Sequence, residues 1–187
     1  RQMEWSCGLN LSFGIANRYP PPMSATKSSR TPELPAKDAI RAKAETLGFD
    51  AIGFARAESG VVAREGLDRF LAGGWHGDMD WMETTADRRA DPQMLWPEVR
   101  SASVLGTNYG PARDPMTILG EPDLGAVSAY AQTIRDYHDV LKKRLRQLAR
   151  WIAESQDCGV KLFVDTAPLM EKPLAQQAGM GWQGKHS

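Results

Sequence analysis

Residues 160–187 read Val160-Lys-Leu-Phe-Val-Asp-Thr-Ala-Pro-Leu-Met-Glu-Lys-Pro-Leu-Ala-Gln-Gln-Ala-Gly-Met-Gly-Trp-Gln-Gly-Lys-His-Ser187. The run 160–164 is rich in β-branched and aromatic residues, which is typical of a buried strand. Asp165 follows at the carboxyl end of this strand, where α/β folds place their ligands. Apolar residues then recur at helical spacing, and Gly179 and Gly181 are expected to end a short helix. A candidate functional carboxylate therefore lies between a strand and a helix.

Upstream of this stretch, helix and strand patterns alternate. Apolar residues at helical spacing predict helices, and β-rich runs predict strands, over residues 35–47 (helix), 49–55 (strand), 61–71 (helix), 102–109 (strand) and 129–155 (helix). The longest helix has one apolar stripe with basic residues on its remaining surface. Prolines and glycines between 111 and 125 predict a long loop. This order of elements predicts an α/β (α+β) fold class in which helices and a sheet form layers.

The strand 49–55 has one face of small residues, which are Ala51, Gly53 and Ala55. Without bulky side chains, such a face allows a helix or a ligand to come close to the backbone.

The segment 74–82 combines glycines and acids with Trp75 and Trp81. These indoles either fill gaps in the core or line a pocket, and the composition favours the core. Arg88 and Arg89 precede Asp91-Pro92 and predict a solvated turn.

Residues 1–31 show no helical or strand pattern, and their prolines and small polar residues predict a disordered leader. Because Met23 could be the initiating methionine, residues 1–22 are expected to be translated sequence upstream of the protein itself. The folded domain is therefore expected to span residues 32–187.

The composition indicates one globular domain of 187 residues with zero net charge and 42% hydrophobic residues. The zero net charge gives no electrostatic indication of a nucleic-acid partner. No apolar run is long enough for a membrane span. We expect a soluble, cytoplasmic, monomeric protein.

Cys7 and Cys158 cannot hold an iron–sulfur cluster, which generally needs four thiolates at short spacing. No residue is therefore predicted to bind a metal.

Two phosphate-loop patterns occur at Gly179-Met-Gly-Trp-Gln-Gly184-Lys185, one of the dinucleotide type and one of the Walker type. Both need a strand before the glycines and a helix after them. Here a predicted helix precedes the glycines, and His186 stands where a Ser or Thr would bind magnesium. We therefore do not assign a nucleotide site.

Asp165 has two possible roles. As a general acid it would need a pKa raised by about 3 units, roughly 4 kcal/mol, which burial over an apolar strand can provide. As a helix cap it would accept backbone hydrogen bonds, which lower a carboxyl pKa. The residues alone favour the cap.

Longer motifs resemble one protein family. Val164-Asp-Thr-Ala-Pro-Leu-Met-Glu-Lys172, followed by Ala178-Gly-Met-Gly-Trp-Gln-Gly-Lys185, resembles the N-terminal domain of the epoxyqueuosine reductases, which modify tRNA. Two upstream stretches resemble the same family in the same order, namely His76-Gly-Asp-Met-Asp-Trp-Met82 with Arg88-Arg-Ala-Asp-Pro92, and Asp136-Tyr-His138. The resemblance runs from about Pro35 to the last residue.

The resemblance implies a cobalamin-binding, nitroreductase-like domain that removes the epoxide oxygen of epoxyqueuosine in the tRNA anticodon loop, with electrons supplied through two [4Fe–4S] clusters. It places the catalytic acid on Asp165, which would protonate the oxygen as the epoxide opens. It also implies a set of residues at the cofactor: Lys172, Gly181, Trp182, Gly184, Lys185, Tyr137 and His138.

Family members continue beyond the Gly-Lys motif into a ferredoxin-like module with cluster cysteines, which this chain lacks. We therefore expect a fragment that is inactive by itself. Two other classes remain open. One is a flavin-dependent, nitroreductase-like enzyme or a corrinoid reductase, and the other is a non-catalytic domain whose Trp- and Pro-rich loops bind another protein.

Overall fold

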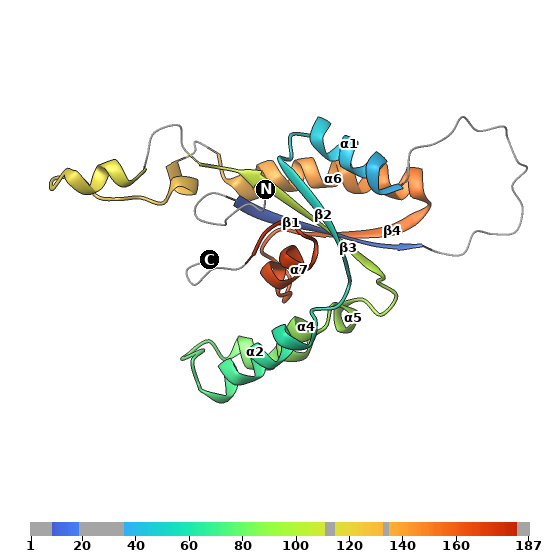
Figure 1. Ribbon diagram of the computed structural model, residues 1–187, viewed down its shortest axis with the longest axis horizontal. Coiled ribbons are helices and arrows are strands. Elements are labelled where there is room, and N and C mark those ends of the chain that lie inside the picture. The colour runs from blue at the N-terminus through green and yellow to red at the C-terminus, as the bar shows by residue number, and fades with distance from the viewer. Residues whose placement is uncertain (1–8, 19–35, 111–114, 133–134, 183–187) are drawn as a thin grey trace, which may run out of the picture.

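A four-stranded sheet forms the centre of the computed structural model, which describes residues 9–18, 36–110, 115–132 and 135–182 (Figure 1). The strands are β1 (Leu9–Arg18), β2 (Ala51–Arg56), β3 (Ser101–Asn108) and β4 (Cys158–Phe163), and they lie in the order β2-β3-β1-β4. Each neighbouring pair is antiparallel. The mixed content of helices and strands agrees with the predicted α+β class.

Strand β1 lies between β3 and β4, and Phe13 pairs with Val104 on one side and Phe163 on the other. The prediction of disorder over residues 1–31 is therefore wrong for residues 9–18, whereas the rest of that stretch lies outside the described residues. The run from Leu9 to Ala16 alternates apolar with polar or small residues, which is the period of a strand. Its partners are distant in sequence, so pairing could not be read from neighbouring residues.

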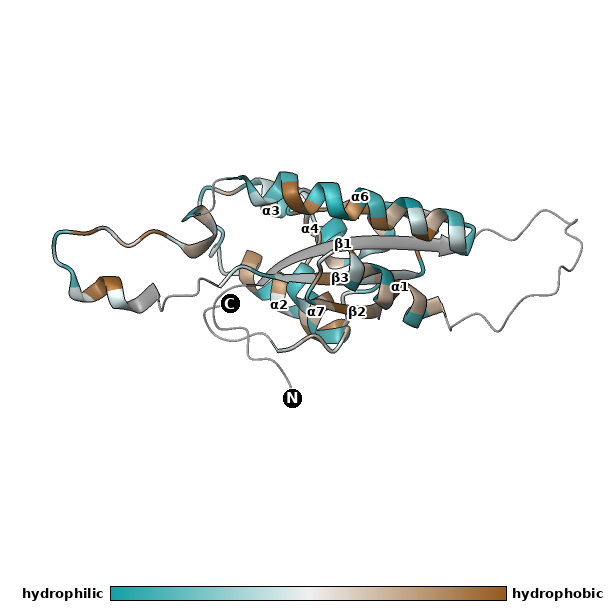
Figure 2. Cartoon of the chain, turned by 90° about the horizontal axis from the view of Figure 1, so that it is seen from above, coloured by the Kyte–Doolittle hydropathy of each residue, from teal (hydrophilic) through white to brown (hydrophobic). Residues whose placement is uncertain are grey.

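Helices α1 (Ala36–Thr46) and α6 (Tyr137–Gln156) cover one face of the sheet (Figure 1). Figure 2 shows apolar and polar positions alternating along α6, as its predicted stripe requires. The buried residues between these helices and the sheet are Ile40, Ala44, Phe49, Leu105, Leu141, Leu145, Leu148, Ile152 and Val164. Burial of this stripe, and not the basic surface, attaches the helix to the sheet.

Helix α6 begins at Tyr137, eight positions later than the start predicted at residue 129, where a separate 3-10 turn, η2 (Ala129–Gln132), lies instead. Asp136 is the N-cap, and its carboxylate accepts a hydrogen bond from the His138 backbone N–H at 2.8 Å. Such a cap satisfies a free N–H at the helix end and fixes the first residue.

Helix α7 (Glu171–Gln177) packs on the opposite face of the sheet, where Val104, Leu174, Ala175 and Met180 are buried together. Adjacent residues of β3 thus point to opposite faces of the sheet, with Val104 facing α7 and Leu105 facing α6. The prediction of close approach at the small face of β2 is confirmed. A Cβ on Gly53 would lie 2.5 Å from the Ala178 carbonyl oxygen and 2.8 Å from Met180 Cγ.

Four helices between β2 and β3 form a group below the sheet (Figure 1). They are α2 (Val61–Ala72), α3 (Trp81–Thr84), α4 (Ala86–Ala90) and α5 (Pro92–Leu95). The predicted solvated turn at 88–92 is wrong, because Ala90 and Pro92 are buried. The group joins the sheet through a third apolar cluster around Ala57, Val99 and Leu169.

The predicted loop 111–125 contains one 3-10 helix, η1 (Pro115–Gly120), which projects away from the sheet (Figure 1). In the described part of the chain, no helix combines the length and the apolar character needed to cross a membrane.

Candidate functional site

Asp165 follows the buried Val164 at the end of β4 and has a positive φ of 50°. An aspartate tolerates this left-handed conformation better than most residues, because its short side chain can form local hydrogen bonds. Its Oδ2 accepts a hydrogen bond from the Tyr137 hydroxyl at 2.8 Å and lies 3.7 Å from His138 Nε2. The turn after β4 therefore directs this carboxylate toward the first turn of α6.

His138 is held in place from two sides. Its ring stacks on Tyr137 with centroids 4.0 Å apart, and its Nδ1 lies 2.8 Å from Asp136 Oδ1. Hydrogen bonds from the His138 backbone N–H and ring lower the pKa of Asp136, which keeps that carboxylate charged at neutral pH. The cap of α6 thereby orients the imidazole toward Asp165.

The structure does not support a capping role for Asp165. Helix α7 begins at Glu171, its N-cap is Met170, and no side chain caps it. The predicted burial of Asp165 is also absent, because 45% of its side chain is exposed. The apolar strand before it therefore does not remove this carboxylate from water.

The second carboxyl of the site is the half-buried Glu171, whose Oε1 is closed off from solvent and which the sequence analysis did not single out. Burial, and then the nearby Asp165, raise the pKa of Glu171 to about 8, so this group is protonated at neutral pH. A glutamate in the first turn of a helix is normally charged and interacts favourably with the helix dipole. Its burial depends on packing between distant segments, so no local pattern could have revealed it.

Asp165 and Glu171 lie on the wall of an open cavity of about 780 Å³ between α3–α4 and the segment after β4. The lining residues are Trp81, Thr85, Arg88, Arg89, Asp165, Thr166, Ala167, Pro168, Leu169, Met170, Glu171, Lys172 and Pro173. One cavity thus combines two acids, three basic side chains and apolar surface. Such a combination suits a large ligand with both apolar and polar parts.

Trp81 lines this cavity and is 53% exposed, and Trp75 is 70% exposed, so the expectation that both fill the core is wrong. The Arg89 guanidinium lies 4.7 Å from the Trp81 ring centroid, and its Nε donates to Thr85 Oγ1 at 3.1 Å. These contacts hold Trp81 beside the cavity with part of its ring free for a ligand.

Ser59 connects the two walls of the cavity. Gln177 of α7 donates from Nε2 to the Ser59 carbonyl at 2.8 Å, and the Ser59 hydroxyl donates to the Arg89 carbonyl at 3.4 Å. Because Ser59 is 3% exposed, water competes little for these bonds. The connection keeps α4 and α7 at a fixed separation.

The residues implied at a cofactor are only partly brought together. Lys172 lines the cavity, and Tyr137 and His138 reach it through Asp165. Gly181 and Trp182 follow α7 and are not among the lining residues, and Trp182 is 46% exposed. Gly184 and Lys185 lie outside the described residues. Within the described ranges, no three His, Cys, Asp or Glu side chains are grouped to hold a metal ion.

Comparisons with known proteins agree on one family. The family model described as epoxyqueuosine reductase QueG, DUF1730, matches residues 89–166. The chain is 42% identical over 152 residues to the epoxyqueuosine reductase of Gloeobacter violaceus, covering 79% of this chain and 45% of that protein. It is 41% identical over 143 residues to that of Pseudomonas aeruginosa, covering 75% and 39%.

A comparison with solved structures also finds similarity to the epoxyqueuosine reductases. A crystal structure of an epoxyqueuosine reductase with an epoxyqueuosine-modified tRNA-Tyr stem loop aligns with a TM-score of 0.63 and 25% identity, covering 80% of this chain and 40% of that one. The chain spans less than half the length of the curated relatives that it matches. In sequence and in fold, therefore, this chain is similar to part of the epoxyqueuosine reductases.

Proposed function

We propose that this chain forms the cobalamin-binding, proton-donating site of a longer epoxyqueuosine reductase, which reduces epoxyqueuosine to queuosine in tRNA. The observation that carries the proposal is the position of Asp165, which borders the large cavity and is held by the Tyr137 hydroxyl at 2.8 Å. The domain would span residues 32–187 together with strand β1.

The cavity has the chemistry for a large planar cofactor and, being open to solvent, can take part of one. Its volume of about 780 Å³ lies in the upper part of the usual range for ligand sites, roughly 300–1,000 Å³. Glu171 Oε1 is buried without a hydrogen-bond partner, and corrinoids carry peripheral amides that donate such bonds. Lys172 and Trp81 would contact the cofactor from opposite walls. We further assign the segment Gly181, Trp182, Gly184 and Lys185 to its edge.

When bound, cobalamin supplies the reducing chemistry, and this chain supplies position and protons. Asp165 would protonate the epoxide oxygen as its first bond to carbon breaks, because an alkoxide is a poor leaving group without a proton. Tyr137 and His138 would hold the carboxyl group in that direction. The [4Fe–4S] clusters of the proposed enzyme would be held by another part of the longer protein, because this chain has two cysteines.

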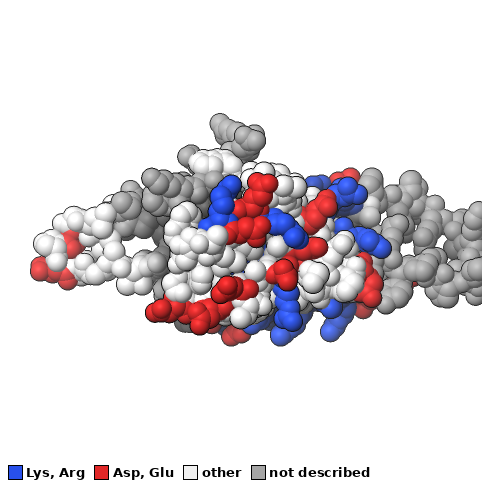
Figure 3. Space-filling model, turned by 90° about the horizontal axis from the view of Figure 1, so that it is seen from below, with Lys and Arg blue, Asp and Glu red and all other residues white. Residues whose placement is uncertain are grey.

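The tRNA would approach at the α3–α4 side of the cavity. The exposed Arg88 of α4 lines the cavity and can contact a phosphate. Figure 3 shows basic and acidic side chains interspersed on the face seen from below, so recognition would use local contacts of this kind. We further propose that the protein acts in the cytoplasm, where a tRNA substrate would be met.

Reconstitution with cobalamin tests this proposal. We expect the longer protein to retain cobalamin through gel filtration, with the characteristic visible absorption of that cofactor. The double variant that combines Trp81→Ala and Lys172→Ala should retain less cobalamin. An Asp68→Asn variant, changed on the exposed surface of α2, should bind like the wild type. Retention of a flavin without cobalamin would contradict the proposal and support a nitroreductase-like enzyme.

A further inference from the structure

We propose that Glu171 holds the second proton of the epoxide reduction and passes it to Asp165. This inference rests on the proposed function, because it deepens the chemistry of the same site. Glu171 acts through Asp165 and is therefore a positioning and proton-supplying residue.

The balance of the reaction requires two protons. Removing the oxygen of an epoxide breaks both C–O bonds, forms a C=C bond and releases the oxygen as water. The change therefore consumes two electrons, which come from the reduced corrinoid, and two protons, which must both reach the same oxygen. Asp165 carries one proton at a time, so it must be reloaded before the water can leave, and a neighbouring acid can do this when bound substrate covers the cavity.

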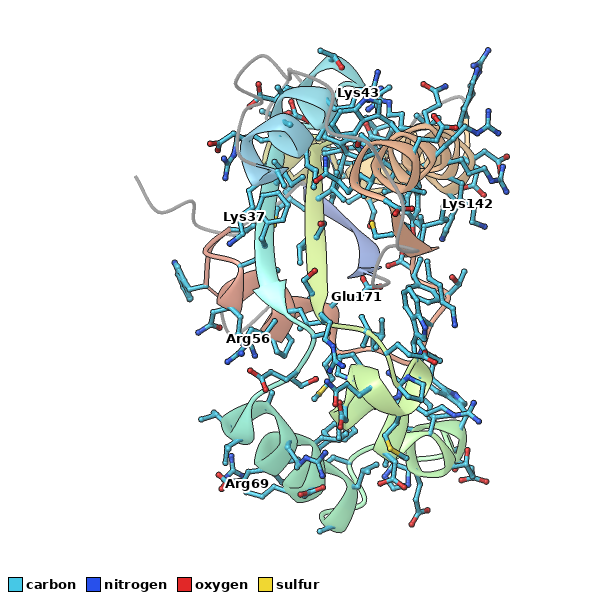
Figure 4. All side chains as sticks on the ribbon, turned by 90° about the vertical axis from the view of Figure 1, so that its right-hand side faces the viewer. Lys37, Lys43, Arg56, Arg69, Lys142 and Glu171 are labelled. Atoms are coloured by element: carbon cyan, nitrogen blue, oxygen red, sulfur yellow. The ribbon has the colours of Figure 1, made fainter. Side chains whose placement is uncertain are left out.

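Glu171 has the geometry of that acid. Asp165 is the neighbouring group that acts on its pKa, and Glu171 Oε1 is buried without a hydrogen-bond partner. Both residues line the same cavity. Figure 4 shows Glu171 in the interior between the sheet and the lower helices, whereas the labelled lysines and arginines lie at the periphery. A proton on Glu171 is thus held on the same cavity wall as Asp165 and can pass to it there.

The charges around Glu171 are mixed. Asp165 faces it from the turn after β4, and Lys172 follows it in α7, while Arg88 and Arg89 line the cavity from α4. Burial, and then the charge of Asp165, raise the pKa of Glu171 to about 8. A glutamate that merely stabilised the first turn of α7 would be charged and exposed, and this one is neither.

A carboxyl titration of this chain tests proton storage independently of catalysis. With carbon-13-labelled glutamate, we expect one side-chain resonance to titrate near pH 8. The resonance should disappear in Glu171→Gln and persist in Glu154→Gln, a control on the exposed surface of α6. Asp165→Asn should shift its midpoint to lower pH. Titration of every glutamate in the ordinary acidic range would overturn the inference.

Turnover of the longer protein tests proton delivery. With cobalamin in excess, so that the site is filled in every variant, we expect Glu171→Gln to lower kcat at least tenfold and to remove the alkaline limb of the pH profile. Glu171→Asp should restore part of the rate, and Glu154→Gln should behave as wild type. A wild-type rate and pH profile in Glu171→Gln would overturn the inference alone, since the proposed function depends on cobalamin uptake and on Asp165.

Discussion

Two carboxyl groups at one cavity differ in their surroundings. Asp165 is partly exposed and accepts from Tyr137, whereas Glu171 is half-buried and has its pKa raised to about 8. Neighbouring acids with different environments commonly divide the tasks of holding and transferring a proton. At the scale of single residues, the site is therefore a pair of acids, of which Asp165 is oriented by the first turn of α6.

Replacement of Asp165 by asparagine removes the transferable proton and preserves the shape of the side chain. We expect the longer protein to keep its cobalamin but to reduce an epoxyqueuosine-containing stem loop about 10²–10⁴-fold more slowly, the usual contribution of a general acid. Turnover measured beside the Asp68→Asn control checks this prediction. A rate near wild type would remove Asp165 from the chemistry.

Replacement of Tyr137 by phenylalanine removes the hydroxyl that donates to Asp165 at 2.8 Å. The loss of one hydrogen bond to a neutral acid corresponds to about 0.5–1.5 kcal/mol, so we expect kcat to fall by roughly two- to tenfold. Because the aromatic ring remains, the fold should be retained. Unchanged kinetics in Tyr137→Phe would show that this bond does not orient the acid.

At the scale of elements, the site depends on how closely α7 approaches β2. Gly53 allows the Ala178 carbonyl and Met180 to contact the strand backbone, and the Ser59 connection holds α7 to α4. Both contacts set the position of Glu171 at the start of α7.

A valine at Gly53 would collide with backbone atoms of Ala178, which cannot rotate away. We expect Gly53→Val to lower the free energy of unfolding by about 1–3 kcal/mol, the usual cost of overpacking, and to displace α7. Gly66→Ala is the matched control, because nothing lies within 4 Å of a Cβ at this position in α2. It should raise stability by about 0.5–1 kcal/mol. Urea denaturation of both variants measures the difference, and equal stabilities would contradict the packing argument.

At the scale of the whole molecule, β1 completes the sheet, since it is hydrogen-bonded to both β3 and β4. Deleting residues 1–18 would leave two unpaired strand edges in the middle of the sheet, which favours aggregation. We expect this deletion to abolish cooperative unfolding, measured by circular dichroism, whereas deleting residues 1–8 should leave it intact. Cooperative unfolding of the shorter chain would show that β3 and β4 do not need β1.

The stability of the whole chain should also depend on pH through Glu171. Its pKa rises from an ordinary 4.5 to about 8 on folding, so the folded state binds this proton more tightly than the unfolded chain. The resulting stabilisation is complete below pH 4.5 and is lost as the pH rises through 8. At about 1.4 kcal/mol for each unit of pKa, the change amounts to several kcal/mol.

Denaturant titrations below and above this window check the prediction. The free energy of unfolding should fall toward alkaline pH in the wild type and in Glu154→Gln, and less steeply in Glu171→Gln. Parallel pH dependence in all three proteins would contradict it.

The sequence by itself determined the local elements and the family. Helical spacing in α1, α2 and α6 and the β-rich runs of β2, β3 and β4 depend on neighbouring residues, so they could be read directly. The short run after β4 likewise identified Asp165 and the segment around Lys172 as the place of a site.

The tertiary structure alone decided the central position of β1, the placement of Trp81 on the cavity wall and the burial of Glu171. Each depends on contacts between segments far apart in the chain. The pKa of Glu171 in particular follows from desolvation by those segments and from Asp165 nearby. Because a carboxyl group becomes neutral only when surrounding chain removes its water, no inspection of residues 165–172 alone could have separated the buried acid from the exposed one.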